Sequence, residues 1–109
     1  MNIKDIYGRD CPTLYTLSLI SGKWRLPILW KIYEHKVLRF HELKKEVTGI
    51  TNMMLTQCLQ DFEAHHIVQR IQYDEIPPKV EYSLTSSGIE LVEILKVVNA
   101  WGEKYWMKE

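Results

Sequence analysis

The clearest pattern in the chain is an apolar stripe in the segment 51–63, whose spacing is that of an α-helix. Apolar residues recur there at i, i+3, i+4 and i+7; they are Leu55, Cys58, Leu59 and Phe62. Thr51 precedes the stripe and is a favoured N-cap residue, because its hydroxyl accepts a hydrogen bond from an unpaired amide of the first turn. Ile50 and Leu55 have the spacing of a hydrophobic staple around that cap. The pattern predicts a helix over 51–63.

The opposite side of this predicted helix carries side chains of another kind. Before Asp61 it has amide, hydroxyl and thioether groups and no charge; the residues are Asn52, Met53, Thr56, Gln57 and Gln60. Amides and hydroxyls can donate and accept hydrogen bonds. Two interpretations stay open here: a face that contacts a partner, or the ordinary solvent face of a core helix.

A shorter helix is predicted immediately upstream. Phe40, Leu43 and Val47 are spaced at helical intervals and are followed by Thr48 and Gly49. Gly49 can adopt a positive φ, which the end of a helix before a tight turn usually requires. Two short amphipathic helices joined by such a turn form the helix-turn-helix pattern, here over 40–63. The segment 51–63 is then in the place of the recognition helix.

Two further helices are expected before this pair. Pro12 fits the first position of a helix over 11–20. The segment 23–34 is the most apolar of the chain, and Pro27 is tolerated there because it falls within the first turn of a helix. The first ten residues show no clear period and are interpreted as an arm or a frayed start.

After Phe62 the period changes from that of a helix to that of a strand. Apolar and polar residues alternate over 67–73 and again over 80–84. Between them Pro77 and Pro78 cannot donate to a ladder, so the pairing must stop at a turn. A β-hairpin over 67–84 that directly follows a helix-turn-helix is a wing. The predicted fold is mainly α with a small β-hairpin wing, preceded by a strand of two or three residues at Leu38-Arg39.

The last predicted helix has more apolar surface than one small core can absorb. Thr85 is its expected N-cap and the helix runs over 86–106. One face carries Val92, Leu95, Val98, Trp101 and Tyr105. Exposed apolar patches of this size are rare on monomers. We therefore expect this face to form a dimer interface, packed against its mate or against the helix 11–20 of the partner.

Composition limits the class of protein. A chain of 109 residues is expected to be one domain, 1–109, with little room for a second core. Two cysteines without CxxC spacing suit a reducing cytoplasm, and neither a signal peptide nor a long apolar run predicts export or membrane insertion. The formal net charge is zero, which counts against strong non-specific nucleic-acid binding but leaves room for a local basic surface.

No catalytic, cofactor or metal motif stands out. The adjacent His65 and His66 point to different sides of a helix, with neither carboxylate nor cysteine at ligand spacing. The five scattered glycines form neither a dinucleotide-binding nor a phosphate-binding loop. We therefore expect neither an enzyme nor a metal site nor a cofactor.

Several short motifs occur together in one order along the chain. They are Cys11-Pro12, Gly22-Lys23-Trp24, Arg39-Phe40-x-Glu42-Leu43, Gly49-Ile50 and Pro77-Pro78-Lys79-Val80-Glu81-Tyr82-Ser83-Leu84-Thr85. In these motifs the chain resembles the HxlR-type family of bacterial winged helix-turn-helix regulators, within the broader MarR-like group. The resemblance covers about Cys11 to Gly102. It implies a cytoplasmic homodimer on a pseudo-palindromic operator, with the recognition helix in the major groove and dimerisation through the helices 11–20 and 86–106.

Two positions depart from the family pattern. Pro27 stands where an ordinary helix former is expected, and His66 stands where the family usually has glycine. If the second position needs a positive φ, histidine is among the better alternatives to glycine. Neither departure changes the expected fold.

With this resemblance, the polar face of 51–63 becomes a candidate base-reading surface. Asn and Gln can pair bidentately with adenine, Thr can contact a base or the thymine methyl group, and Met offers apolar contact. The candidate residues are Asn52, Met53, Thr56, Gln57 and Gln60. Phosphate contacts, which position a protein without specifying sequence, are expected from Lys23, Arg39, Lys44, Lys45, Arg70 and Lys79.

Cys11 is a candidate redox sensor. It is the expected N-cap of the first helix, where the macrodipole favours a thiolate, and its place near the terminus suggests partial exposure. Some members of the family that the chain resembles sense oxidants or electrophiles through a cysteine before that proline. The alternative role for Cys11 is a small residue packed at the dimer interface. Cys58 lies on the apolar stripe and is expected to be inert.

Two functions remain in competition. The first is a sequence-specific transcriptional regulator that binds double-stranded DNA as a homodimer, with room for a small-molecule or oxidant effector. The second is a winged-helix protein-interaction module without DNA binding. Neutral net charge favours the second slightly, whereas the uncharged polar face with lysines and arginines around it favours the first.

Overall fold

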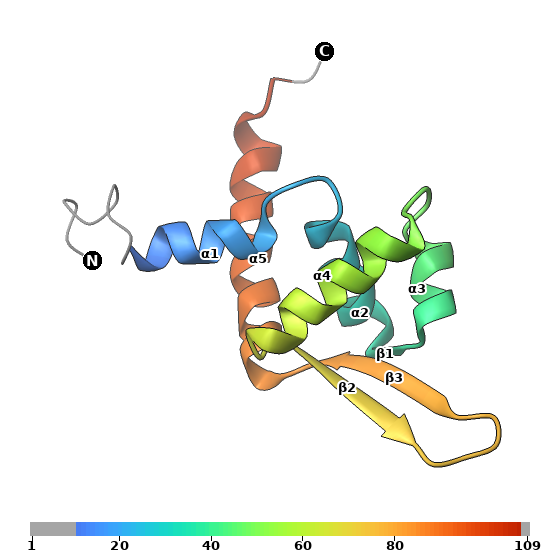
Figure 1. Ribbon diagram of the computed structural model, residues 1–109. Helices are drawn as coiled ribbons and strands as arrows, with labels where there is room; N and C mark the ends of the chain where they lie inside the picture. Colours follow the sequence, from blue (N-terminus) through green and yellow to red (C-terminus); the bar gives the residue numbers. More distant parts are fainter. Residues whose placement is uncertain (1–10, 108–109) are drawn as a thin grey trace.

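The computed structural model describes residues 11–107 and has the fold class predicted from the sequence, a mainly helical winged helix-turn-helix with a small antiparallel sheet (Figure 1). Its elements in chain order are α1 (Pro12–Ile20), α2 (Arg25–His35), β1 (Val37–Leu38), α3 (Phe40–Glu46), α4 (Asn52–Ala64), β2 (Val68–Tyr73), β3 (Lys79–Leu84) and α5 (Ser86–Tyr105). Because α2 begins at Arg25, Pro27 lies within its first turn, as expected.

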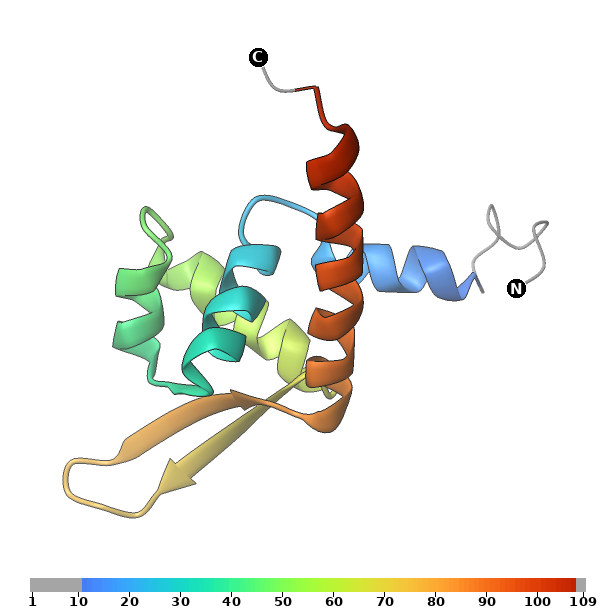
Figure 2. The same cartoon turned by 180° about the vertical axis from the view of Figure 1, so that it is seen from behind.

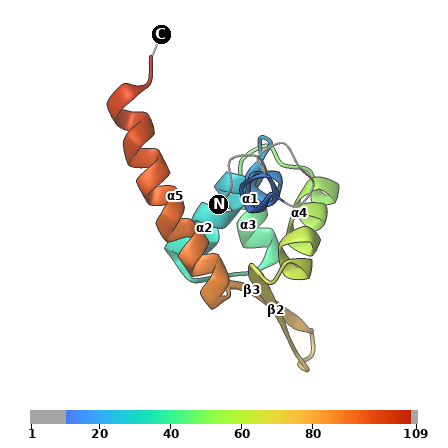
Figure 3. The ribbon, with the colours of Figure 1, turned by 90° about the vertical axis from the view of Figure 1, so that its left-hand side faces the viewer.

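The core lies between α2, α3 and α4. Its fully enclosed side chains come mainly from these helices and include Ile28, Ile32, Leu43, Leu55 and Phe62. The helix α2 has the central place, with α4 and α5 on opposite sides of it in the side view (Figure 3). This arrangement leaves the outer face of α4 and much of α5 on the surface.

Local sequence signals determine how the recognition helix begins and ends. The Thr51 hydroxyl accepts a hydrogen bond from the Met54 amide at 3.1 Å, so the predicted cap is confirmed. Gly49 has φ 90°, as expected, and His66 has φ 59°, so the position where the family usually has glycine does need a positive φ. At His66 this backbone turns the chain from α4 towards β2 at the small cost that histidine incurs in the left-handed region.

The sheet has one strand more than the hairpin. Strand β3 pairs on one side with β2, from Val68 opposite Leu84 to Tyr73 opposite Lys79. On its other side it pairs with β1, where Val37 lies opposite Ser83. The short strand was expected one residue later, at 38–39. Because β1 leads directly into α3, this pairing attaches the wing to the helix-turn-helix.

The helix α5 begins against the base of the wing. The Thr85 side chain accepts a hydrogen bond from the Gly88 amide at 3.1 Å, which confirms it as the cap. A Cβ on Gly88 would lie 2.2 Å from the Ile67 carbonyl oxygen, so only glycine allows α5 to approach this closely. From there α5 runs to Tyr105, one residue short of the predicted end, and its outer half extends beyond the body (Figure 2).

Candidate nucleic-acid interface

The recognition helix α4 is oriented by its apolar stripe. Leu55, Cys58, Leu59 and Phe62 are each at most 2% exposed. A helix anchored along one face must present the opposite face outward. Periodicity alone therefore determined which side of α4 is available to a partner.

The predicted base-reading residues lie together on that outward face. All are exposed, and together they line one shallow surface hollow; they are Asn52, Met53, Thr56, Gln57 and Gln60. Met53 is the most open of the large apolar side chains on α4, at 80% exposed. The hollow offers amide, hydroxyl and thioether groups without a charge, which suits contacts with base edges.

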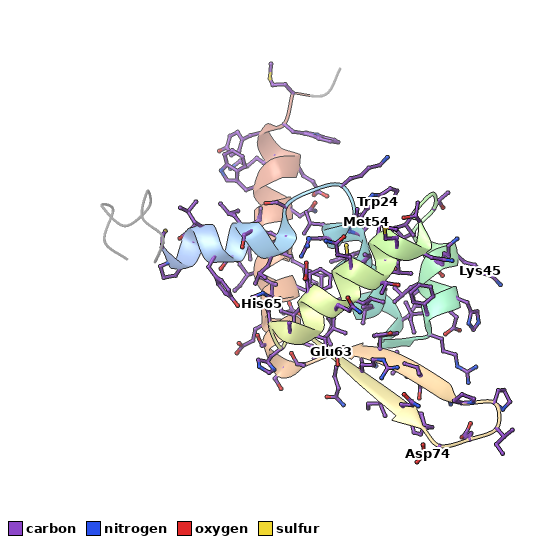
Figure 4. The ribbon with its side chains drawn as sticks, viewed as in Figure 1. Trp24, Lys45, Met54, Glu63, His65 and Asp74 are labelled. Atoms are coloured by element: carbon purple, nitrogen blue, oxygen red, sulfur yellow. The ribbon has the colours of Figure 1, made fainter. Side chains whose placement is uncertain are left out.

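Exposed cations flank this surface on the side of α3. Lys44 and Lys45 are in the last turn of α3, and Lys45 extends away from the body in Figure 4. The Arg39 amide donates to the Glu42 carboxylate at 2.7 Å, which holds the start of α3, while the Arg39 side chain stays exposed. The three cations are therefore free to contact phosphates.

The cations of the wing differ from one another. The exposed Arg70 donates to the Gln72 side chain at 3.3 Å. Lys79 lies 3.8 Å from a Glu81 carboxylate oxygen and 5.2 Å from the centre of the Tyr73 ring. A hydrogen bond with Glu81 also raises the pKa of Tyr73. Lys79 is therefore already paired with an anion, which the sequence did not indicate.

The tip of the wing is acidic rather than basic. Asp74, Glu75 and Ile76 are exposed there, and Ile76 has no protein cover at all, at 103% exposed. Asp74 is seen on the wing loop in Figure 4. Carboxylates at this place repel phosphates, so the tip itself is a poor candidate for phosphate contact.

A cation that sequence analysis missed connects α2 with the recognition helix. An Arg25 guanidinium nitrogen lies 2.5 Å from an Asp61 carboxylate oxygen, and the guanidinium lies 5.8 Å from the centre of the Phe62 ring. Burial raises the pKa of the nearby Cys58 thiol, and Arg25 offsets part of that rise. The neighbouring Lys23, by contrast, is exposed with its ammonium 4.7 Å from the Trp24 ring. Arg25 therefore positions α4, whereas Lys23 stays free for a partner.

The proposed dimer residues on α5 fall into two groups. Val98, Trp101 and Tyr105 are 58%, 68% and 56% exposed, and Leu95 is half-buried. Val92 is 1% exposed because it packs into the core of its own protomer, so its prediction as an interface residue is wrong. The exposed part of the stripe therefore begins at Val98, almost two helical turns after Val92.

The two cysteines are both buried. Cys11 is the N-cap of α1, as expected, but it is only 1% exposed, so the expected partial exposure is wrong. That expectation used only its distance along the chain from the terminus, which says nothing about contacts in space. Cys58 is also 1% exposed, as its place on the apolar stripe predicted.

The helix α1 contacts the end of the recognition helix. The Tyr15 hydroxyl lies 3.1 Å from Nδ1 of His65, and the two rings meet edge to face with centres 5.6 Å apart.

Within residues 11–107 no group of three or more His, Cys, Asp or Glu side chains is placed to hold a metal ion. No helix in the same range is long and apolar enough to cross a membrane.

Sequence comparisons place the chain among known regulators. It matches the model of the HxlR-like helix-turn-helix family over residues 19–109. It is 44% identical over 96 residues to an HTH-type transcriptional regulator of Halalkalibacterium halodurans, covering 88% of this chain and 85% of that protein. With YybR, an HTH-type transcriptional regulator of Bacillus subtilis, it shares 41% identity over 102 residues, covering 92% of this chain and 81% of YybR.

Solved structures of similar sequence have the same fold. The redox regulator HypR in its oxidised form matches with a TM-score of 0.77 at 39% identity, covering 90% of this chain and 100% of HypR. The reduced form of the transcriptional regulator YodB from Bacillus subtilis matches with a TM-score of 0.79 at 29% identity, covering 88% of this chain and 94% of YodB.

Proposed function

The chain belongs to the HxlR-like helix-turn-helix family of transcriptional regulators, a non-enzymatic DNA-binding class, and from this premise we propose that it binds a pseudo-palindromic operator as a homodimer. The observation that carries the proposal is the uncharged polar hollow on α4, flanked by the exposed Lys44 and Lys45. Such a helix fits the major groove, which is wide enough to admit it and displays a distinct pattern for each base pair. The protein would act in the cytoplasm, where its DNA lies.

In this proposal the residues divide by role. The face formed by Asn52, Met53, Thr56, Gln57 and Gln60 reads bases. Lys23, Arg39, Lys44, Lys45 and Arg70 contact phosphates, and Lys79 contributes less because Glu81 already pairs with it. Phosphate contacts fix register, and base contacts select sequence.

Dimerisation is proposed through α1 and the outer half of α5. Exposed apolar side chains support it on both helices: Leu14 and Leu17 on α1, and Val98, Trp101 and Tyr105 on α5. With two-fold symmetry, the recognition helices would lie about 34 Å apart, one helical turn of DNA.

Salt dependence tests the proposal against a protein-interaction module without DNA binding. The acidic wing tip and the neutral net charge favour that second function. A DNA reader that neutralises several phosphates weakens steeply as salt rises, because counterions are released. The measurement is a binding titration on DNA from upstream of the protein's own gene at several salt concentrations, with selection from random DNA where that site fails. If selection yields no preferred sequence, the operator proposal fails.

Redox control through Cys11 is a separate proposal, supported by the similarity to the redox regulator HypR. Hydrogen peroxide would convert the thiol to a sulfenic acid and release water. Because Cys11 is buried, this reaction requires the start of α1 to open first. The effect would pass from α1 to the recognition helix through the contact between Tyr15 and His65.

The test compares wild type with Cys11→Ser before and after peroxide, and mass spectrometry confirms modification of Cys11. We expect operator affinity to change in wild type only. An unchanged affinity of modified wild type contradicts the redox proposal and leaves the DNA-binding proposal intact.

A further inference from the structure

A polar cluster joins α2 to the middle of α5. The Tyr33 hydroxyl donates to a Glu93 carboxylate oxygen at 2.5 Å and accepts from the Lys96 ammonium at 2.5 Å. The ammonium also lies 3.4 Å from the same carboxylate and 4.4 Å from the centre of the Tyr33 ring. The hydrogen bond with Tyr33 lowers the pKa of Glu93 and raises the pKa of Lys96, so the cluster favours the charged form of both side chains.

Two hollows border the contact of α2 with α5, and Tyr33 lines one of them. One hollow is lined by Leu26, Pro27, Leu29, Trp30, Val92, Leu95, Val98 and Asn99. The other is lined by Ile32, Tyr33, Glu34, Lys36, Leu84 and Ile89. At its start α5 is held by the close approach of Gly88 to the Ile67 carbonyl oxygen, and the hydrogen bonds of Tyr33 attach it to α2 at a second point farther along. Because hydrogen bonds need short distances and a narrow range of angles, this second attachment restricts the tilt of α5.

The helix α2 is also attached to the recognition helix. Near its other end Arg25 pairs with Asp61 of α4 at 2.5 Å. Thus α2 contacts both the proposed DNA-reading helix α4 and α5. The outer half of α5 extends beyond its contact with α2 (Figures 2 and 3). A small rotation of α5 at Lys96 becomes a larger displacement at Tyr105, because each residue adds about 1.5 Å along the helix.

We propose that Tyr33 is a positioning residue that sets the angle between α5 and the recognition helix, and thereby the spacing of half-sites that the dimer accepts. The second part rests on the homodimeric DNA binding proposed above, whereas the first concerns a single protomer. Tyr33 touches no base or phosphate in this role. It acts through Glu93 and Lys96.

The first experiment measures, without DNA, the distance between α4 and the outer end of α5, which changes when the angle between the two helices changes. Spin labels are placed at Glu63→Cys and Lys104→Cys, both exposed positions, whereas the native cysteines are buried. Labelled protein is diluted with an excess of unlabelled protein, so that distances within one protomer dominate. We expect Tyr33→Phe to broaden or shift the distance distribution. The matched control Tyr82→Phe removes a hydroxyl from β3 and should leave it unchanged. An identical distribution in Tyr33→Phe overturns the proposal.

The second experiment varies the distance between the two half-sites of the selected operator by one base pair at a time. Wild type should lose affinity on either side of its optimum, and Tyr33→Phe should reduce that loss by about threefold to thirtyfold. Affinity for one isolated half-site should stay as in wild type. An unchanged spacing profile overturns the link to half-site spacing, even where the distances broaden. If wild type binds no preferred DNA, the proposed function fails while the distance measurement still decides the role of Tyr33.

Discussion

The helices α4 and α5 have similar apolar stripes, yet the protein uses the two stripes differently. On α4 the whole stripe is buried, down to Phe62 at 0% exposed. On α5 the stripe starts in the core at Val92 and ends in solvent, with Trp101 at 68% exposed. Both patterns predicted a helix with one apolar face, but only on α4 does the core of the same protomer cover the whole of that face. An apolar stripe therefore identifies the face of a helix that will be buried, but it does not show whether the same protomer or a second protein buries it.

Their outward faces differ too. The exposed side of α4 is polar and uncharged, which suits contact with base edges in a wet groove. The exposed stripe of α5 is aromatic and aliphatic, which suits contact with another protein. One protomer thus has two different surfaces, joined by α2 and by the cluster around Tyr33.

The largest expected effect is loss of the buried stripe on α4. Phe62→Ala removes a fully enclosed ring and should lower the free energy of unfolding by about 3–5 kcal/mol, because the surrounding core cannot fill the cavity. Denaturant unfolding followed by circular dichroism measures it. The control Gln60→Ala, on the exposed face of the same helix, should change stability by less than about 0.5 kcal/mol. If Phe62→Ala lowers the free energy of unfolding by no more than the control does, burial of the apolar stripe does not hold α4 in place.

Replacing an aromatic residue of the α5 stripe with alanine should weaken dimerisation and leave folding largely unaffected. Trp101→Ala should weaken the dimer by about 2 kcal/mol or more, because buried tryptophans dominate many interfaces. Sedimentation equilibrium measures the association constant. Glu90→Gln, near the start of the same helix, serves as the control. A stable wild-type monomer at micromolar concentration would contradict the dimer altogether.

Gln57 tests the outward face of α4. Gln57→Ala should reduce the preference for the operator over random DNA by about 1–3 kcal/mol, because an amide that pairs with a base edge is lost. Parallel titrations with both DNAs measure the preference. Equal weakening on both DNAs would assign Gln57 to general affinity rather than to base reading.

The smallest expected effect separates two lysines that look alike in the sequence. Lys45→Ala should weaken binding to all DNA and flatten the salt slope by about one unit, because one phosphate contact is lost. Lys79→Ala should change the slope less, since Glu81 lies 3.8 Å from its ammonium. Salt titrations of both variants measure the two slopes. A larger change of slope for Lys79→Ala than for Lys45→Ala would contradict the pairing of Lys79 with Glu81.

The sequence by itself determined the features that depend on neighbouring residues. The cap at Thr51, the positive φ at Gly49 and the outward face of α4 follow from side chains a few positions apart. Backbone sterics and helical periodicity act over such short distances, so they can be inferred without a fold. The fold class followed from the same signals taken in order.

Only the tertiary structure decided which distant side chains meet. Arg25 and Asp61 are 36 positions apart, and Tyr33 is 60 positions from Glu93 and 63 from Lys96. The burial of Val92 and Cys11 likewise depends on contacts in space rather than on spacing along the chain. An ion pair or a buried contact forms wherever the packing of helices brings two groups together, and a single sequence carries no local pattern that specifies such a meeting.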